Sequence, residues 1–203
     1  MEDIISMLRS HNAGKFARNA DQLKAIVPDM INFKWADNLG YKFGVQRVLC
    51  HGDICPTNTF WKQTGGNIEL AAVIDYQTAH FGCSATDLVQ IFVTFLSGKD
   101  RRAHWEQLIE DFYGYLKQEV GNRRVPYILD QLKDAYLQFF PTGAFTLIPY
   151  IAPLFEIIPK NVHEEQKRKE YLEMVTEKME YLLEDLLHCH DRNVKIRDKK
   201  TAA

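Results

Sequence analysis

Strand-forming sequence is confined to one short part of this 203-residue chain. Three apolar runs lie close together there, at residues 45–50, 58–62 and 68–74. A Thr-Gly-Gly-Asn turn sequence at residues 64–67 separates the last two runs, so these two are predicted to pair as a hairpin. One small hairpin followed by a helical mass is therefore the predicted architecture.

The remainder of the chain shows the apolar spacing of amphipathic helices. Helices are predicted at residues 1–31, 87–96, 100–120, 126–140 and 164–188. The last helix is predicted to turn six residues inward: Tyr171, Met174, Val175, Met179, Leu182 and Leu186. The preceding stretch is predicted to be broken into short pieces by Pro141, Pro149, Pro153 and Pro159. The predicted fold class is α+β and mostly α-helical.

The loop between the first two apolar runs contains a spaced set of polar residues. His51 stands two residues before Asp53, and Asn58 follows five residues after that aspartate. This is the spacing of the protein kinase catalytic loop. Phosphoryl transfer needs one carboxylate to orient the attacking hydroxyl and to accept its proton. The spacing therefore predicts Asp53 as a catalytic base.

A second carboxylate follows the third apolar run. Asp75 comes directly after Ile74 and lies 17 residues beyond Asn58, about the length that two short strands and a tight turn require. Magnesium prefers oxygen ligands, often one or two carboxylates completed by phosphates and water. Asn58 and Asp75 are therefore predicted to be metal ligands.

These motifs resemble a known kinase superfamily. The segments Val48-Leu49-Cys50-His51-Gly52-Asp53 with Asn58, Val73-Ile74-Asp75-Tyr76-Gln77, Gly82 and Asp87-Leu88 resemble choline kinases and aminoglycoside phosphotransferases. Within this superfamily the resemblance is closest to the ecdysteroid kinase-like (CHK kinase-like) group. It implies a protein-kinase-like C-terminal lobe at residues 1–190. It also implies ATP and Mg²⁺ as cofactors and transfer of phosphate to a hydroxyl of a small metabolite, steroid or xenobiotic.

The resemblance also suggests roles for residues around the loop. His51 and Asp87 are expected to brace the loop by hydrogen bonds. Gln77 and His80 are expected either to line the substrate cleft or to satisfy the turn that follows Asp75. The identity of the phosphate acceptor depends on the shape of the pocket, so choline, a sugar, a steroid alcohol and a xenobiotic hydroxyl all suit the motif.

The N-terminal lobe of such kinases has no counterpart in the sequence. Only 50 residues precede His51, and they are mostly helical in pattern. Four lysines occur among them, but none lies on an apolar strand followed by an acidic helix: Lys15, Lys24, Lys34 and Lys42. The chain is therefore expected to hold the C-lobe only, and its kinase activity is expected to need an N-lobe.

Two other functions are compatible with these residues. The chain can be a catalytically inactive, truncated or pseudokinase protein that acts as a binding module, associating through the face that an N-lobe normally covers. It can also be a metal-dependent hydrolase that uses His51, Asp53 and Asp75. That second alternative leaves Asn58 and the hairpin spacing without a role.

Composition narrows the possible partners. The net charge of −2 does not provide the excess of positive charge that is typical of nucleic-acid-binding domains. No signal peptide is recognised, and no apolar run of the sequence reaches the length of a membrane span, so no membrane partner is expected. The four cysteines form no C-x-x-C pair, which favours a reduced, cytoplasmic protein. Residues 191–203 are basic and are predicted to form a disordered tail.

Overall fold

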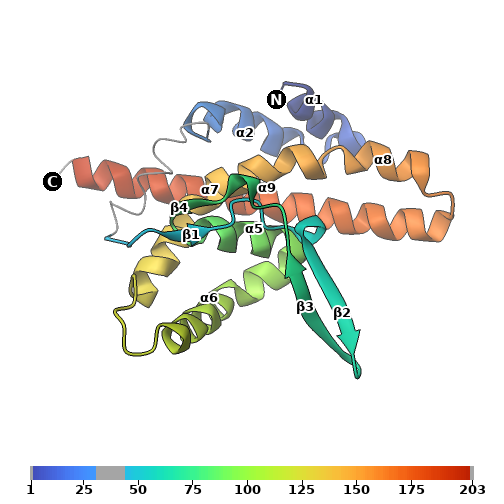
Figure 1. The fold of residues 1–203 in the computed structure, drawn as a ribbon. Helices are drawn as coiled ribbons and strands as arrows, with labels where there is room; N and C mark the ends of the chain where they lie inside the picture. Colours follow the sequence, from blue (N-terminus) through green and yellow to red (C-terminus); the bar gives the residue numbers. More distant parts are fainter. Residues whose placement is uncertain (1, 31–43, 202–203) are drawn as a thin grey trace. The chain divides into compact units, whose positions relative to one another are not determined.

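The computed structural model of the protein, drawn in Figure 1, describes residues 2–30 and 44–201. Within these residues the chain forms two compact units. The first unit comprises residues 2–30, 97–99 and 140–201, and the second comprises residues 44–96 and 100–139. Lys34 and Lys42, two of the four lysines that precede the candidate loop, lie outside the described residues. The α+β, mostly helical class predicted from the sequence is confirmed.

The first unit is entirely helical in its described part. Its elements are α1 (Glu2–Ser10), η1 (His11–Gly14), α2 (Ala17–Met30), α8 (Leu154–Asn161), α9 (Glu165–Thr201) and the second half of α7 (Leu129–Ile151). The apolar faces of these helices form its core, which includes the fully buried residues Ile5, Leu8, Leu23, Met179, Leu182 and Leu186. Burial of these side chains is the main stabilising contribution to the unit.

The long helix α9 differs from its prediction at both ends. Met179, Leu182 and Leu186 are buried as predicted, but Tyr171 and Met174 are exposed. Periodicity identifies the apolar face of a helix, but it does not show how far along that face a neighbour extends.

The C-terminal end differs from the disordered tail predicted for residues 191–203, because α9 continues to Thr201. His190 is buried at this end of the helix, and its Nε2 lies 3.0 Å from the Asp29 carboxylate of α2. Arg197 also lies 3.6 Å from the same carboxylate. These contacts with α2 anchor the end of α9.

The prolines break the chain less than the sequence predicts. Pro141 and Pro149 lie inside α7, and only the segment at Ala152 and Pro153 separates α7 from α8. A proline in a helix interior loses a hydrogen bond and crowds the preceding turn. The neighbouring residues Ala144, Phe145 and Ile148 are buried, so packing of this helix offsets the local cost.

The apolar helical stretch Leu129–Asn161 is long and apolar enough to cross a membrane, by length and composition alone. This finding corrects the sequence prediction that no stretch of the chain reaches that length. Because 56% of its most apolar window is buried within the structure, the same stretch also meets the description of a core helix.

The second unit contains both small sheets. Strand β2 (Thr59–Thr64) pairs antiparallel with β3 (Asn67–Val73), which confirms the predicted hairpin. Figure 1 shows this pair as a long two-stranded arm. Its turn residues Gly65 and Gly66 both have positive φ, as a two-residue type I′ turn requires. The first apolar run is a short strand, β1 (Val48–Cys50), and it pairs with β4 (His80–Gly82), which the sequence pattern does not predict.

Between these strands lie two short 3₁₀ turns, η2 (Pro56–Asn58) and η3 (Tyr76–Thr78). Helices α5 (Ala85–Phe95) and α6 (Gly98–Val120) follow, together with the first half of α7. The Ser84 hydroxyl donates to the Tyr127 hydroxyl at 2.7 Å just before α5, and burial raises the pKa of Tyr127 to about 12. Along the chain, β1 is followed by the loop, the hairpin and β4, and α5 begins shortly after β4.

Gly98 provides a test of the packing at the start of α6. A Cβ at this position would lie closer to the Tyr181 side chain of α9 than van der Waals contact allows, whereas a Cβ at Gly114 of the same helix would meet open space. We expect Gly98→Ala to lower the free energy of unfolding by about 1–3 kcal/mol because of overpacking. Gly114→Ala is the matched control and is expected to raise it by about 0.5–1 kcal/mol. Urea unfolding of both variants measures the difference, and equal effects would contradict the packing described.

The contact between His190 and Asp29 predicts that the stability of the protein depends on pH. The hydrogen bond from His190, aided by Arg197, lowers the pKa of the Asp29 carboxyl below its ordinary value of 3.8. A carboxyl with a lowered folded-state pKa contributes stability above its unfolded-state pKa and loses it as the pH falls through the folded-state pKa. Asp29→Asn is therefore expected to lower the free energy of unfolding at neutral pH and to leave it unchanged at pH 2. Since the Asp29 side chain is half-exposed, the cost should stay below about 1 kcal/mol. Thermal unfolding of both proteins from pH 7 to pH 2 measures this difference, and a cost that persists at pH 2 would contradict it.

Candidate functional site

The candidate site is built around the loop that joins β1 to η2. Two side chains of α5 hold this loop from one side. The Asp87 carboxylate accepts hydrogen bonds from the backbone N–H groups of His51, at 2.7 Å, and of Gly52, at 2.9 Å. One turn further along α5, the Gln90 carboxamide accepts from Ile54 N–H at 3.0 Å and donates to Gly52 C=O at 2.8 Å. Helical spacing places both side chains on the face of α5 that meets the loop.

The remaining backbone groups of the loop bond to side chains of η2, of η3 and of the loop itself. The Asp53 N–H donates to His51 Nδ1 at 3.2 Å, and the Asp53 carbonyl accepts from Asn58 Nδ2 at 2.8 Å. The Thr78 hydroxyl of η3 donates to the His51 carbonyl at 3.2 Å. Seven consecutive backbone polar groups, from the N–H of His51 to the N–H of Ile54, therefore each bond to a side chain.

His51 links this loop to the end of β3. Its side chain is buried, and its Nε2 lies 2.9 Å from the carbonyl of Ile74. Because Nδ1 accepts the Asp53 N–H, Nε2 carries the hydrogen and donates to that carbonyl. The ring also packs against Tyr76, with centroids 4.6 Å apart. Both nitrogens of His51 are thus used in backbone contacts, which is the arrangement of a bracing residue.

Asp53 and Asn58 are in contact. Besides bonding the Asp53 carbonyl, Asn58 Nδ2 lies 3.2 Å from the Asp53 carboxylate. Asn58 is buried, whereas Asp53 is half-buried. With Nδ2 used for these two contacts, Oδ1 of Asn58 is the group available to bind a cation, since it forms no hydrogen bond with the described residues.

The hairpin brings Asp75 to the same end as Asn58. The Ile74 N–H donates to the Asn58 carbonyl at 3.0 Å, so the residue before Asp75 is bonded to Asn58 itself. Asp75 is exposed, and its φ of 63° and ψ of 59° make it the one non-glycine residue with positive φ in the described chain. A side chain held in this region costs conformational energy, and such residues cluster at functional sites.

The donor chemistry of these residues fits magnesium. Asn58 and Asp75 offer the hard oxygen ligands that Mg²⁺ prefers, with Asp53 beside them. Within residues 2–30 and 44–201, no cluster of three His, Cys, Asp or Glu residues is placed to hold a metal. A metal bound here would therefore need further ligands from phosphate and water.

Gln77 and His80 are both exposed, but they have different surroundings. Gln77 Nε2 lies 3.4 Å from the Asp75 carboxylate. His80 belongs to β4, and its Nδ1 lies 3.0 Å from the Thr78 carbonyl. The structure therefore places Gln77 beside a candidate metal ligand and His80 beside the turn after it.

Sequence reasoning misses two of the residues that hold the loop, Gln90 and Thr78. A signal for Gln90 is present in the sequence, because it lies three residues after Asp87 in a predicted helix and therefore on the same face. Thr78 has no comparable signal, since its contact depends on the turn η3 and on the pairing of β4 with β1.

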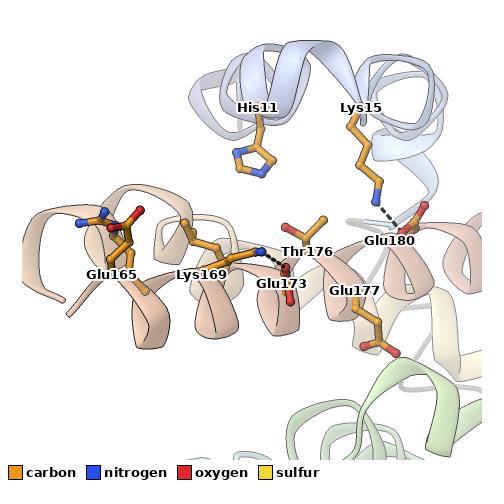
Figure 2. A pocket seen from close by; sticks show the side chains of 10 residues that line it. His11, Lys15, Glu165, Lys169, Glu173, Thr176, Glu177 and Glu180 are labelled. Carbon is orange, nitrogen blue, oxygen red and sulfur yellow. Dashed lines mark hydrogen bonds and ion pairs between the residues drawn. The ribbon is translucent and has the colours of Figure 1, made fainter. Parts of the chain in front are cut away.

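The first unit contains a cavity of about 700 Å³ that involves none of these residues. Figure 2 shows His11 and Lys15 of η1 and the following turn above one face of α9. The charges of the cavity largely pair with one another, as in Lys15 with Glu180 at 2.8 Å and Lys169 with Glu173 at 4.0 Å. Burial, aided by the charge of Lys15, lowers the pKa of His11. With both signs of charge on its walls, this cavity does not favour one class of ligand.

A substitution at Gly52 tests whether the backbone of the loop must lie close to Thr78 of η3. Its φ is +85°, and a Cβ there would lie 2.5 Å from the Thr78 carbonyl oxygen. Gly65 in the hairpin turn also has positive φ, but a Cβ there would meet nothing within 4 Å. We expect Gly65→Ala to cost about 1–2 kcal/mol of stability through its backbone alone. Gly52→Ala is expected to cost about 2–5 kcal/mol, because overpacking adds to the backbone term. Chemical denaturation compares the two variants, and a Gly52→Ala cost equal to that of Gly65→Ala would rule out the close approach.

Comparison with known proteins gives one relative and one family. The chain is 29% identical over 113 residues to the Caenorhabditis elegans protein named "Uncharacterized kinase-like protein D1044.1". The match covers 54% of this chain and 29% of the relative, so the chain spans less than a third of that protein's length. No solved structure matches. A family model, DUF1679, described as "Uncharacterized oxidoreductase dhs-27", matches residues 1–194, and the chain therefore belongs to the DUF1679 family.

Proposed function

We propose that this chain carries the catalytic loop of an ATP- and magnesium-dependent small-molecule kinase. The proposal rests on one observation. Asp53 contacts Asn58 at one end of the hairpin, and Asp75 lies at the same end. The name of the C. elegans relative, kinase-like, supports the same class. Assignment to the choline kinase and aminoglycoside phosphotransferase superfamily, and to its ecdysteroid kinase-like group, is part of this proposal.

Asp53 would accept a hydrogen bond from the substrate hydroxyl and take its proton as the hydroxyl oxygen bonds to the γ-phosphorus of ATP, while the bond from that phosphorus to the bridging oxygen breaks and ADP leaves. Asn58 and Asp75 would hold Mg²⁺, which neutralises charge on the phosphates when it is bound. Asn58 would also help to orient the Asp53 carboxylate, because its Nδ2 touches that group. The acceptor would be a hydroxyl of a small metabolite, steroid or xenobiotic, and Gln77 lies beside Asp75 where it could contact a bound substrate.

An oxidoreductase activity, which the family description names, has less support from this chain. The dinucleotide-binding fingerprint G-x-G-x-x-G does not occur in the sequence. The described strands form only antiparallel pairs, whereas that fingerprint belongs to a parallel sheet. A metal-dependent hydrolase is also less well supported, because both ring nitrogens of His51 are already used in backbone contacts.

A non-catalytic binding module is the second candidate. Its support is an exposed apolar face on the hairpin, formed by Trp61, Ile68 and Leu70, which are each at least half exposed. Trp61 and Leu70 are cross-strand partners, and their face is continued by Ile68. In this alternative the chain would associate through this hairpin face or through the face that an N-lobe normally covers. A cytoplasmic location is proposed with either function, supported by four free cysteines.

The kinase proposal is tested by Asp53→Asn in the full-length protein. We expect loss of a general base to lower kcat by about 10²–10⁴-fold, measured as ADP formation with choline, sugar, sterol and xenobiotic alcohols as acceptors. Thermal stabilisation by ATP with Mg²⁺ should remain, because Asp53 is proposed as the base and not as a metal ligand. Asp75→Asn should instead lose the magnesium-dependent part of that stabilisation.

Glu69→Gln is a matched control, since Glu69 lies on the same hairpin and its ion pair is with Lys62, at 3.2 Å, away from the loop. Full turnover by the Asp53→Asn variant would exclude the role proposed for Asp53. A wild-type protein that neither turns over nor gains stability from ATP with Mg²⁺ would favour the binding module.

A further inference from the structure

Gln90 occupies a special place among the side chains that hold the loop. Its carboxamide contacts the two peptide groups on either side of Asp53, accepting from Ile54 N–H at 3.0 Å and donating to Gly52 C=O at 2.8 Å. Asp87, by contrast, contacts only the N–H groups that precede Asp53. The Gln90 side chain thus bonds to the peptide groups on both sides of Asp53, the residue proposed as the catalytic base.

The direction of the Asp53 carboxylate depends on the backbone at that residue. Its one side-chain contact within the described chain is Asn58 Nδ2 at 3.2 Å, the long end of the normal range for a hydrogen bond. Rotation of either flanking peptide would move the carboxylate relative to the end of the hairpin. The Gln90 carboxamide opposes both rotations, because the two peptide groups are fixed to one rigid planar group on a helix.

We propose that Gln90 is a positioning residue that sets the orientation of Asp53 through these two peptide groups. The catalytic part of this inference rests on the role of Asp53 as the base. Only a side chain with one donor and one acceptor at this reach satisfies both peptides. A glutamate at this position would satisfy Ile54 N–H when ionised but would set an oxygen against Gly52 C=O. A neutral carboxyl group would restore the donor.

Two substitutions separate positioning from simple packing. Gln90→Met keeps the length and approximate volume of the side chain but removes both hydrogen bonds. Gln90→Glu keeps the acceptor and loses the donor until its carboxyl is protonated, which should occur near or above its ordinary pKa of about 4.3. Thr94→Val is the matched control, because the Thr94 hydroxyl donates to the backbone carbonyl of Gln90, at 2.7 Å on the same helix, and its removal leaves the Gln90 carboxamide in place.

The first measurement is amide hydrogen exchange, residue by residue, in the protein without nucleotide. Gln90→Met is expected to lower the protection factor of the Ile54 amide by about tenfold, the effect of one lost hydrogen bond, while the interior of α5 stays protected. Gln90→Glu should lower it at pH 7 and restore it toward the wild-type value as the pH falls. The wild-type protein is measured at every pH as the reference, because the ionisable side chains of Asp87, Asp53, His51 and His80 also surround the loop.

The second measurement is steady-state kinetics of the full-length protein with the acceptor that wild type uses. Misplacement of the base should lower kcat by about 10–100-fold in Gln90→Met and leave KM for ATP unchanged, with Thr94→Val near wild type. Wild-type turnover with an unaffected kcat in Gln90→Met would overturn the inference while the kinase function stands. If wild type shows no turnover, the kinase function fails, and exchange alone decides whether Gln90 orients the loop. Unchanged Ile54 protection in Gln90→Met would then overturn the inference, and pH-dependent rescue in Gln90→Glu would support it.

Discussion

The candidate site depends on hydrogen bonds between side chains and the backbone of one irregular loop. Seven consecutive polar groups of this loop lack strand or helix partners and are satisfied by Asp87, Gln90, Thr78, His51 and Asn58. An unsatisfied group withdrawn from water costs about 1–3 kcal/mol, so few other loop conformations are compatible with the fold. The position of Asp53 is therefore determined by α5, by the turn after Asp75 and by the loop itself.

The strongest parts of the sequence pattern predict both the hairpin and the residues that it brings together. The turn at residues 64–67 fixes a two-residue connection, and the spacing from Asn58 to Asp75 then follows from strand length. Family resemblance places Asp87 beside the loop, and its carboxylate bonds two N–H groups there. The hairpin is local in the sequence, so its pattern alone predicts it, whereas the contact of Asp87 with His51 joins residues 36 positions apart and is expected only from the resemblance.

The features that could not be predicted depend on tertiary packing. Strand β4 is three residues long and exists because Cys50 and Val48 pair with it. Pro141 and Pro149 are tolerated in α7 because their neighbours are buried, and the end of α9 is ordered by contacts with Asp29 of α2. Burial also raises the pKa of the Cys50 thiol to about 12, which disfavours its nucleophilic thiolate form, and the sequence alone does not reveal this burial.

The two compact units are interwoven along the chain, since the first is assembled from three separate segments and α7 contributes to both. A cut between residues 139 and 140 would divide the continuous helix α7 and separate the segments of the first unit, while every residue of the second unit would stay on the N-terminal piece. Limited proteolysis or subcloning at that point would therefore break up the first unit and leave the second unit, which contains the candidate site, on one fragment. The shortest continuous fragment that contains all described residues of the second unit, residues 44–139, is thus longer than the stretch from Val45 to Leu88 that carries the motifs.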